Sequence, residues 1–79
     1  MAENKTITKK LVLHQDNIHP INEILYCLMV ILKIHSTNAD QIVTIMATKG
    51  KATILTSDED LVKNTQSLFN AYGFYTTLE

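Results

Sequence analysis

The stretch from Leu11 to Leu32 decides the fold, because it places a strand, a polar loop and a helix in succession: LVLHQDNIHPINEILYCLMVIL. The composition of Thr6 to His14, with apolar residues among Thr and Lys, predicts the strand. Pro20 suits the first turn of a helix, with His19 as its N-cap. Apolar residues then recur at helical spacing to about Ile34, and they occupy so much of the circumference that we expect this helix to be sandwiched between neighbours.

A second helix is expected after a short polar break. Thr37, with Asp40 three residues later, has the spacing of a capping box. Gly50 is a natural stop at the other end, because glycine readily adopts the left-handed conformation that ends many helices. One face of this helix is apolar and consists of Ala39, Ile42, Val43 and Met46.

The rest of the chain predicts a strand, a third helix and a final strand. Lys51 to Thr56 is the strand, and Ser57 is expected to cap a helix whose first turn is acidic, as the helix dipole favours. Gly73 would close the helix, and Phe74 to Leu78 would form the last strand. The buried side of the helix is expected to contain Leu61, Leu68, Phe69 and Tyr72.

The resulting order, β-α-α-β-α-β, predicts an α+β fold with three helices packed on one face of a small three-stranded sheet. A chain of 79 residues is expected to form a single domain, residues 1–79, with a short flexible N-terminus over residues 1–5. The ribosomal stalk protein's C-terminal domain has a related architecture, so the fold alone does not fix the function.

Charge and hydropathy argue against two classes of partner. The net charge is −1 and all seven basic residues are Lys, so neither a strong basic field nor the bidentate fork of Arg is available to bind nucleic acid. The longest apolar run, Ile24 to Leu32, is about half of what a membrane span needs, and Met1 to Lys10 does not resemble a signal peptide. We therefore expect a soluble, cytoplasmic protein that binds neither nucleic acid nor membranes, with Cys27 as a buried thiol.

No motif in the sequence predicts an enzyme, a metal site or a cofactor. The spacing of His14, Asp16 and His19 matches no closed zinc pattern. Lys49-Gly50-Lys51 lacks the upstream glycine and the following Ser or Thr of a P-loop, and it is better explained as a helix end. Cys27 lies in an apolar helix, which would raise its pKa and hide it, so a catalytic thiol is not expected.

Leu11 to Ile21, followed through the helix by Ala39-Asp-Gln-Ile-Val43 and then Lys49-Gly-Lys-Ala52, resembles the ClpS family without a gap. ClpS proteins are adaptors that bring substrates to Clp-type AAA+ proteases. The resemblance implies two partners: the N-terminal domain of a Clp unfoldase, and substrate N-termini that carry a large apolar first residue, the N-degron. It also implies a small pocket in which polar groups hold the α-ammonium and an apolar hollow takes the first side chain.

The resemblance further implies which residues form that pocket. Asp16 would be the main counter-charge for the ammonium, Gln15 stands where the family typically has Asn, and Asn17 replaces a second Asp. His19 would lie at the rim. The implied substrate-binding set is Gln15, Asp16, Asn17, His19, Ile21, Ile24, Cys27, Val43, Met46 and Ala47.

Ala47 departs from the family pattern, because ClpS proteins that recognise N-degrons generally have a His at this position as a further ammonium acceptor. Losing one such bond costs about 1.5–3 kcal/mol, or about 10- to 150-fold in affinity. For Asp16 the alternative is an ordinary turn residue that bonds its own backbone. The competing functional hypothesis is a ClpS-fold regulatory or interaction module that binds a Clp ATPase or another protein without recognising N-degrons.

Overall fold

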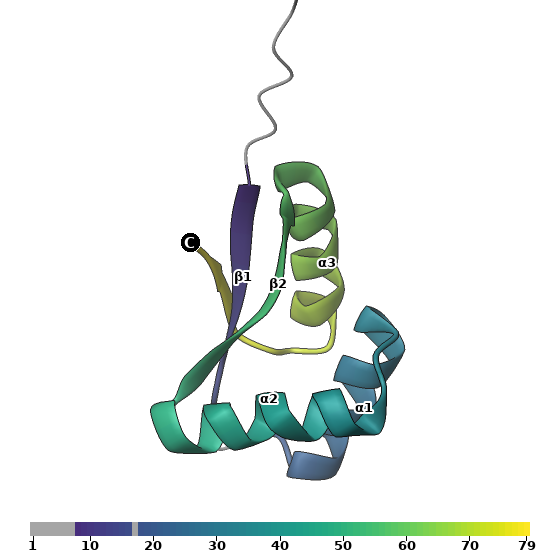
Figure 1. Ribbon diagram of the computed structural model, residues 1–79, viewed down its shortest axis with the longest axis vertical. Helices are drawn as coiled ribbons and strands as arrows, with labels where there is room; N and C mark the ends of the chain where they lie inside the picture. Colours follow the sequence, from purple (N-terminus) through teal and green to yellow (C-terminus); the bar gives the residue numbers. More distant parts are fainter. Residues whose placement is uncertain (1–7, 17) are drawn as a thin grey trace, which may run out of the picture.

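The computed structural model describes residues 8–16 and 18–79 and contains three helices and three strands in the predicted order (Figure 1). The α+β fold class predicted from the sequence is confirmed. The elements are β1 Thr8–His14, α1 Ile21–Leu32, α2 Ser36–Lys49, β2 Lys51–Asp58, α3 Glu59–Ala71 and β3 Thr76–Leu78. The start of the predicted first strand, at Thr6 and Ile7, lies outside the described residues.

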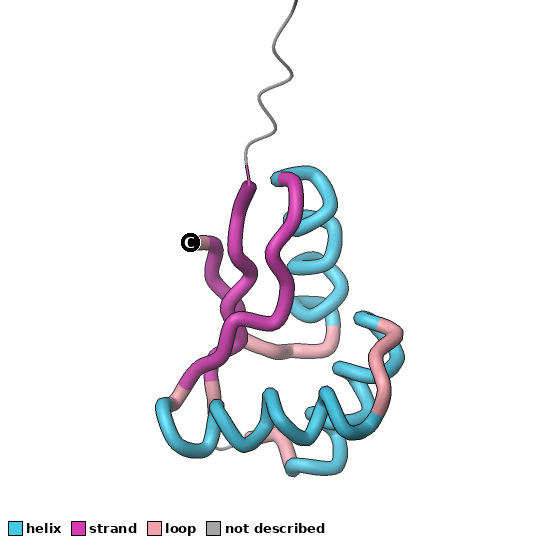
Figure 2. The backbone as a smooth tube through the Cα atoms, viewed as in Figure 1, coloured by secondary structure: helices cyan, strands magenta, loops and turns pink. Residues whose placement is uncertain are grey.

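The three strands form one antiparallel sheet in the order β2-β1-β3, so β1 is central. In Figure 2, β1 and β2 run side by side along the length of the sheet, and the short β3 lies on the other side of β1. The pairing of β1 with β2 shifts between Leu11 and Val12, which leaves Ile54 of β2 unpaired as a bulge. The bulge lets Ile54 and Leu55, although consecutive, both pack against the core.

The core lies between the sheet and the helices, and β1 supplies its centre. Leu11 and Leu13 are 0% exposed and belong to the main cluster together with Leu28, Val62 and Phe69. α3 runs alongside the strands, whereas α1 and α2 lie across one end of the sheet (Figure 1). No helix within residues 8–16 and 18–79 is long and apolar enough to cross a membrane.

The sequence prediction was right about Phe69 but wrong about the other three residues expected on the buried side of α3. Val62, Thr65 and Phe69 face the core, whereas Leu61, Leu68 and Tyr72 are 49–55% exposed. Both sets follow helical spacing, and the two stripes are neighbours on the helix surface. The sheet packs against the stripe that contains Val62 and Phe69, and Leu61, Leu68 and Tyr72 are left beside it.

Several predicted helix ends are displaced. α2 begins at Ser36 with His35 as its N-cap, so Thr37 and Asp40 lie within the helix and form no capping box. Asp58, and not Ser57, caps α3, because its carboxylate accepts the backbone N–H of Leu61 at 3.3 Å.

The two ends of α1 also differ slightly from the prediction. Pro20 is the N-cap in place of His19, and the helix ends at Leu32 because Lys33 adopts a left-handed φ of 57°. The predicted stop of α2 is confirmed: Gly50 has a φ of 82°, and its N–H donates to the Met46 carbonyl.

Candidate functional site

A small hollow lies where the loop after β1 meets α1 and α2. It has a cavity volume of about 40 Å³ and is open to solvent on one side. Ile24 and Met46 are buried at 6% and 2% exposure, whereas Ile21 and Ala47 are exposed. Its lining consists of Gln15, Ile21, Ile24, Val43, Met46 and Ala47. These six residues all belong to the set predicted from the sequence.

Helical spacing explains why these side chains converge. Ile21 and Ile24 are three residues apart on the first turn of α1, so they share one face. Val43, Met46 and Ala47 have the i, i+3, i+4 spacing that puts them on one face of α2. Because α1 and α2 pack against each other, the two faces form opposite walls, and Gln15 closes the hollow from the loop.

The hollow is apolar except for the side chain at Gln15. A volume of about 40 Å³ holds a few water molecules, well below the several hundred Å³ of typical ligand pockets. A large side chain therefore fits only if a wall moves outward. Ile21 is the wall best able to do so, because more than half of its surface is already exposed.

The carboxylate of Asp16 is bonded within its own loop. Its Oδ1 accepts the backbone N–H groups of Ile18 at 3.0 Å and His19 at 2.9 Å. Its Oδ2 lies 2.8 Å from Nδ1 of the His19 ring. Burial alone would raise the pKa of Asp16, but the three hydrogen bonds, led by that from the His19 backbone, lower it below its ordinary 3.8.

His19 joins this loop to the end of α3. Its Nε2 lies 3.2 Å from the Tyr72 carbonyl oxygen, and its ring stacks on Phe74 with centroids 4.0 Å apart and an angle of 24° between the planes. The hydrogen bond to Asp16 is the main reason that the pKa of His19 is raised above its ordinary 6.5. Burial opposes this rise, and the Tyr72 carbonyl adds to it.

The family model described as "ATP-dependent Clp protease adaptor protein ClpS" matches residues 4–73, which is most of the chain. The chain belongs to the ClpS family. Its structure is similar to that of Agrobacterium tumefaciens ClpS2 bound to L-phenylalaninamide, with a TM-score of 0.80 and 16% sequence identity over 95% of this chain and 98% of that chain. At this identity the likeness shows the fold. A comparison with curated protein sequences finds no match.

Membership of the ClpS family makes this chain an adaptor of the ATP-dependent Clp protease, and adaptors of this family are not catalytic. The family resemblance inferred from the sequence is confirmed.

Three residues of the predicted set do not line the hollow of this ClpS chain. Asp16 and His19 lie in the sequence between two lining residues, Gln15 and Ile21, but their side chains are hydrogen-bonded to each other. Cys27 is buried in the core behind the wall, where burial first and Glu23 second raise its pKa. Asn17, a further predicted member, lies outside the described residues.

Sequence reasoning missed the pairing of Asp16 with His19 and the contact of His19 with Tyr72. The i, i+3 spacing of an acid and a histidine in a polar loop is a signal for the first. Nothing in the local sequence indicates the second, because the two residues are 53 positions apart.

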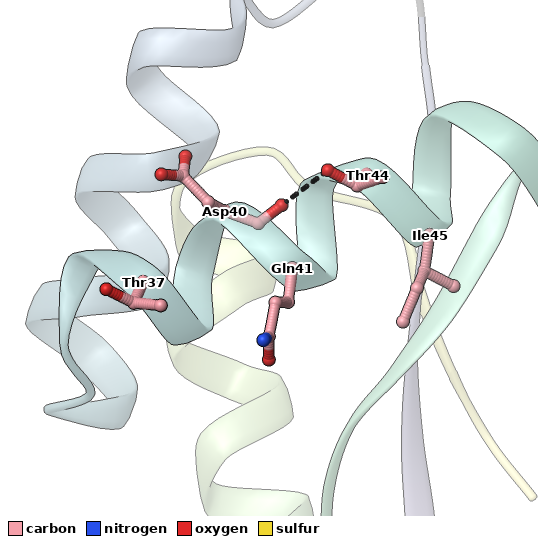
Figure 3. A pocket seen from close by; sticks show the side chains of 5 residues that line it. All are labelled: Thr37, Asp40, Gln41, Thr44 and Ile45. Atoms are coloured by element: carbon pink, nitrogen blue, oxygen red, sulfur yellow. Dashed lines mark hydrogen bonds between the residues drawn. The ribbon is translucent and has the colours of Figure 1, made fainter.

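A larger depression in this ClpS chain lies on the outer side of α2, away from the predicted residues. It is a shallow surface groove of about 470 Å³ whose described lining comes from this one helix: Thr37, Asp40, Gln41, Thr44 and Ile45 (Figure 3). The Thr44 hydroxyl donates to the Asp40 carbonyl at 2.9 Å, so it is already satisfied. Within the described part of the chain, no three His, Cys, Asp or Glu side chains gather to hold a metal. The groove is lined by polar and apolar side chains of this one helix.

Proposed function

We propose that this ClpS protein binds the first residue of substrate chains and delivers them to a Clp unfoldase in the cytoplasm. The observation that carries the proposal is the convergence of Gln15 with five side chains of α1 and α2 on one hollow. The bound L-phenylalaninamide of the structurally similar ClpS2 supports a large apolar first side chain as the occupant. The sequence resemblance to N-degron-binding ClpS proteins supports the same conclusion.

In this proposal the polar loop holds the chain-end ammonium. Gln15 offers an amide oxygen at the mouth of the hollow, and Asp16 supplies the negative charge from the next position. His19 stands at the rim, as the family resemblance implies. An ammonium has three donors, and each charge-assisted bond is worth about 1.5–3 kcal/mol, so two or three acceptors suffice for a specific site.

The test is binding of a short peptide that begins with Phe or Leu, measured by fluorescence anisotropy on the full chain. Asp16→Ala is expected to abolish binding, and acetylation of the peptide N-terminus is expected to do the same because it removes the ammonium. Asp60→Ala is the matched control, since Asp60 is an exposed acid on the distant α3. No detectable binding at millimolar peptide would rule out this function.

A second function is favoured by Ala47, which lines the hollow without offering a side-chain acceptor. In this alternative the chain binds a Clp ATPase, or another protein, and regulates it without recognising N-degrons. The unfoldase N-terminal domain is the proposed partner in both cases, and the acidic start of α3, with Glu59 and Asp60, is a candidate contact. Binding of an isolated unfoldase N-domain that Asp16→Ala leaves intact, combined with no peptide binding, would select this alternative.

A further inference from the structure

The protonation state of His19 follows from its two neighbours. Nδ1 faces the Asp16 carboxylate at 2.8 Å and Nε2 faces the Tyr72 carbonyl at 3.2 Å. An ionised carboxylate and a backbone carbonyl are acceptors only, so both ring nitrogens have to donate. A neutral imidazole carries one N–H, and both bonds therefore exist only in the imidazolium form.

Two further features favour a positive charge at this place. Tyr72 is the C-cap of α3, so its carbonyl lies at the negative end of the helix dipole. The Phe74 ring stacks on the imidazole at 4.0 Å and offers its electron-rich face to the cation. Asp16 and Tyr72 thus bond the two ring nitrogens and Phe74 stacks on the ring, and the side chain of His19 is only 12% exposed.

The charged groups around His19 are few. In the described part of the chain, Asp16 on its own loop and Glu23 on the first turn of α1 act on the imidazole, and both raise its pKa. α3 and the turn that follows it contribute uncharged groups: the Tyr72 carbonyl, the backbone of Gly73 and the Phe74 ring. The proton on His19 therefore depends mainly on Asp16.

We propose that His19 is an internal occupant of the Asp16 carboxylate, and that a chain-end ammonium binds only by replacing the imidazolium at Oδ2. This inference rests on the proposed recognition of substrate N-termini and names how that site is regulated. Both cations compete for one carboxylate, whose Oδ1 is already taken by two backbone N–H groups. Binding of the ammonium then releases the proton of His19.

The competition has a defined pH dependence. Once it leaves Asp16, the imidazole returns toward its ordinary pKa of 6.5, so binding releases a proton only between that value and the raised pKa of His19 in the free chain. Within that interval, affinity increases with pH by at most about tenfold per unit. The gain ends where His19 is neutral, and affinity falls again as the α-amine of the peptide loses its own proton, ordinarily at about 7.7–8.0. The tightest binding is expected at a pH between the pKa of His19 and the pKa of the peptide α-amine.

The first experiment follows the His19 ring by NMR across pH in the free full-length chain. The resonance is assigned by its loss in His19→Gln, which leaves His14 and His35 in the spectrum. We expect a titration midpoint above 6.5 that falls in Asp16→Asn. A midpoint at or below 6.5, or one that Asp16→Asn leaves unchanged, would overturn the inference whatever the peptide does.

The second experiment measures the dissociation constant of a Phe-starting peptide from about pH 5.5 to about pH 7.5, a range that brackets the ordinary pKa of His, about 6.5, and stays below that of the α-amine. Wild type is expected to tighten with pH, whereas His19→Gln binds more tightly at the acidic end and loses this slope. Equal slopes in the two proteins would refute the competition and leave the proposed function standing. Absence of binding by both at every pH would remove the proposed function, and the competition with it. If His19→Gln does not fold, as judged by a poorly dispersed amide spectrum, two other measurements decide whether the competition exists. These are the slope of wild-type affinity against pH and the His19 titration midpoint in Asp16→Asn.

Discussion

Replacing Ala47 with His is expected to tighten binding of a Phe-starting peptide about tenfold. Ala47 lines the hollow on the last turn of α2, and Gln15 lines it from the loop. A new imidazole there supplies the neutral acceptor for the ammonium that the present residue lacks. A hydrogen bond to a charged group contributes about 1.5–3 kcal/mol, and we take the lower end because position 47 is exposed and water competes. About 1.5 kcal/mol corresponds to about tenfold in affinity.

The assay is isothermal titration at about pH 7.5, where an exposed imidazole is mostly neutral and the peptide amine is still largely protonated. Thr48→His is the matched control, because Thr48 is the next residue, is exposed, and donates its hydroxyl to the Thr44 carbonyl outside the hollow. An equal gain from Thr48→His would show a general charge or contact effect. No gain from Ala47→His, in a protein whose wild type binds the peptide, would refute the placement of the ammonium beside α2.

Three further predictions concern stability and are checked by urea denaturation. Phe69→Ala is expected to lower the free energy of unfolding by about 3–5 kcal/mol, because Phe69 is fully buried. Leu68→Ala, on the exposed stripe of α3, should change it by about 0.5 kcal/mol or less. Similar losses in the two variants would contradict the observed orientation of the helix. Gly50→Ala is expected to cost about 1–2 kcal/mol from its φ of 82° alone, since no atom lies within 4 Å of the added Cβ, and an unchanged protein would disprove the left-handed cap. The stability that His19 adds over His19→Gln should be full below about pH 6.5 and lost as pH rises through the raised pKa of His19. In acid, the same contribution should be lost as pH falls below 3.8 through the lowered pKa of Asp16. A stability difference between the two proteins that does not depend on pH would exclude the charged pair.

The fold could be predicted from the sequence because each element carries its own periodicity or end signal. Gly50 and Pro20 mark helix boundaries by backbone geometry that other residues adopt less readily, so their positions were predicted closely. The sequence alone could not identify the buried side of α3, because the stripe containing Leu68 and the stripe containing Val62 both follow helical spacing. Contact with the sheet selects between them, and that is a tertiary effect.

The hollow was predicted more completely than the loop beside it. The family resemblance implied its lining, including Ile24 and Met46, and regular helical spacing explains why these side chains converge. The direction of the Asp16 carboxylate depends on a contact between His19 and a carbonyl 53 residues away, and local sequence carries no record of it. Whether the hollow and the loop bind a chain end stays a prediction.

The central place of β1 in the sheet affects how the chain is completed during synthesis. β1 leaves the ribosome before its neighbour β3. His14 of β1 is hydrogen-bonded to Thr77 of β3, which is made 63 residues later. Until β3 emerges, one edge of a strand rich in leucine and valine has no backbone partner, and such edges invite pairing with other chains. Nascent copies on neighbouring ribosomes are therefore at greatest risk of joining each other just before β3 is made.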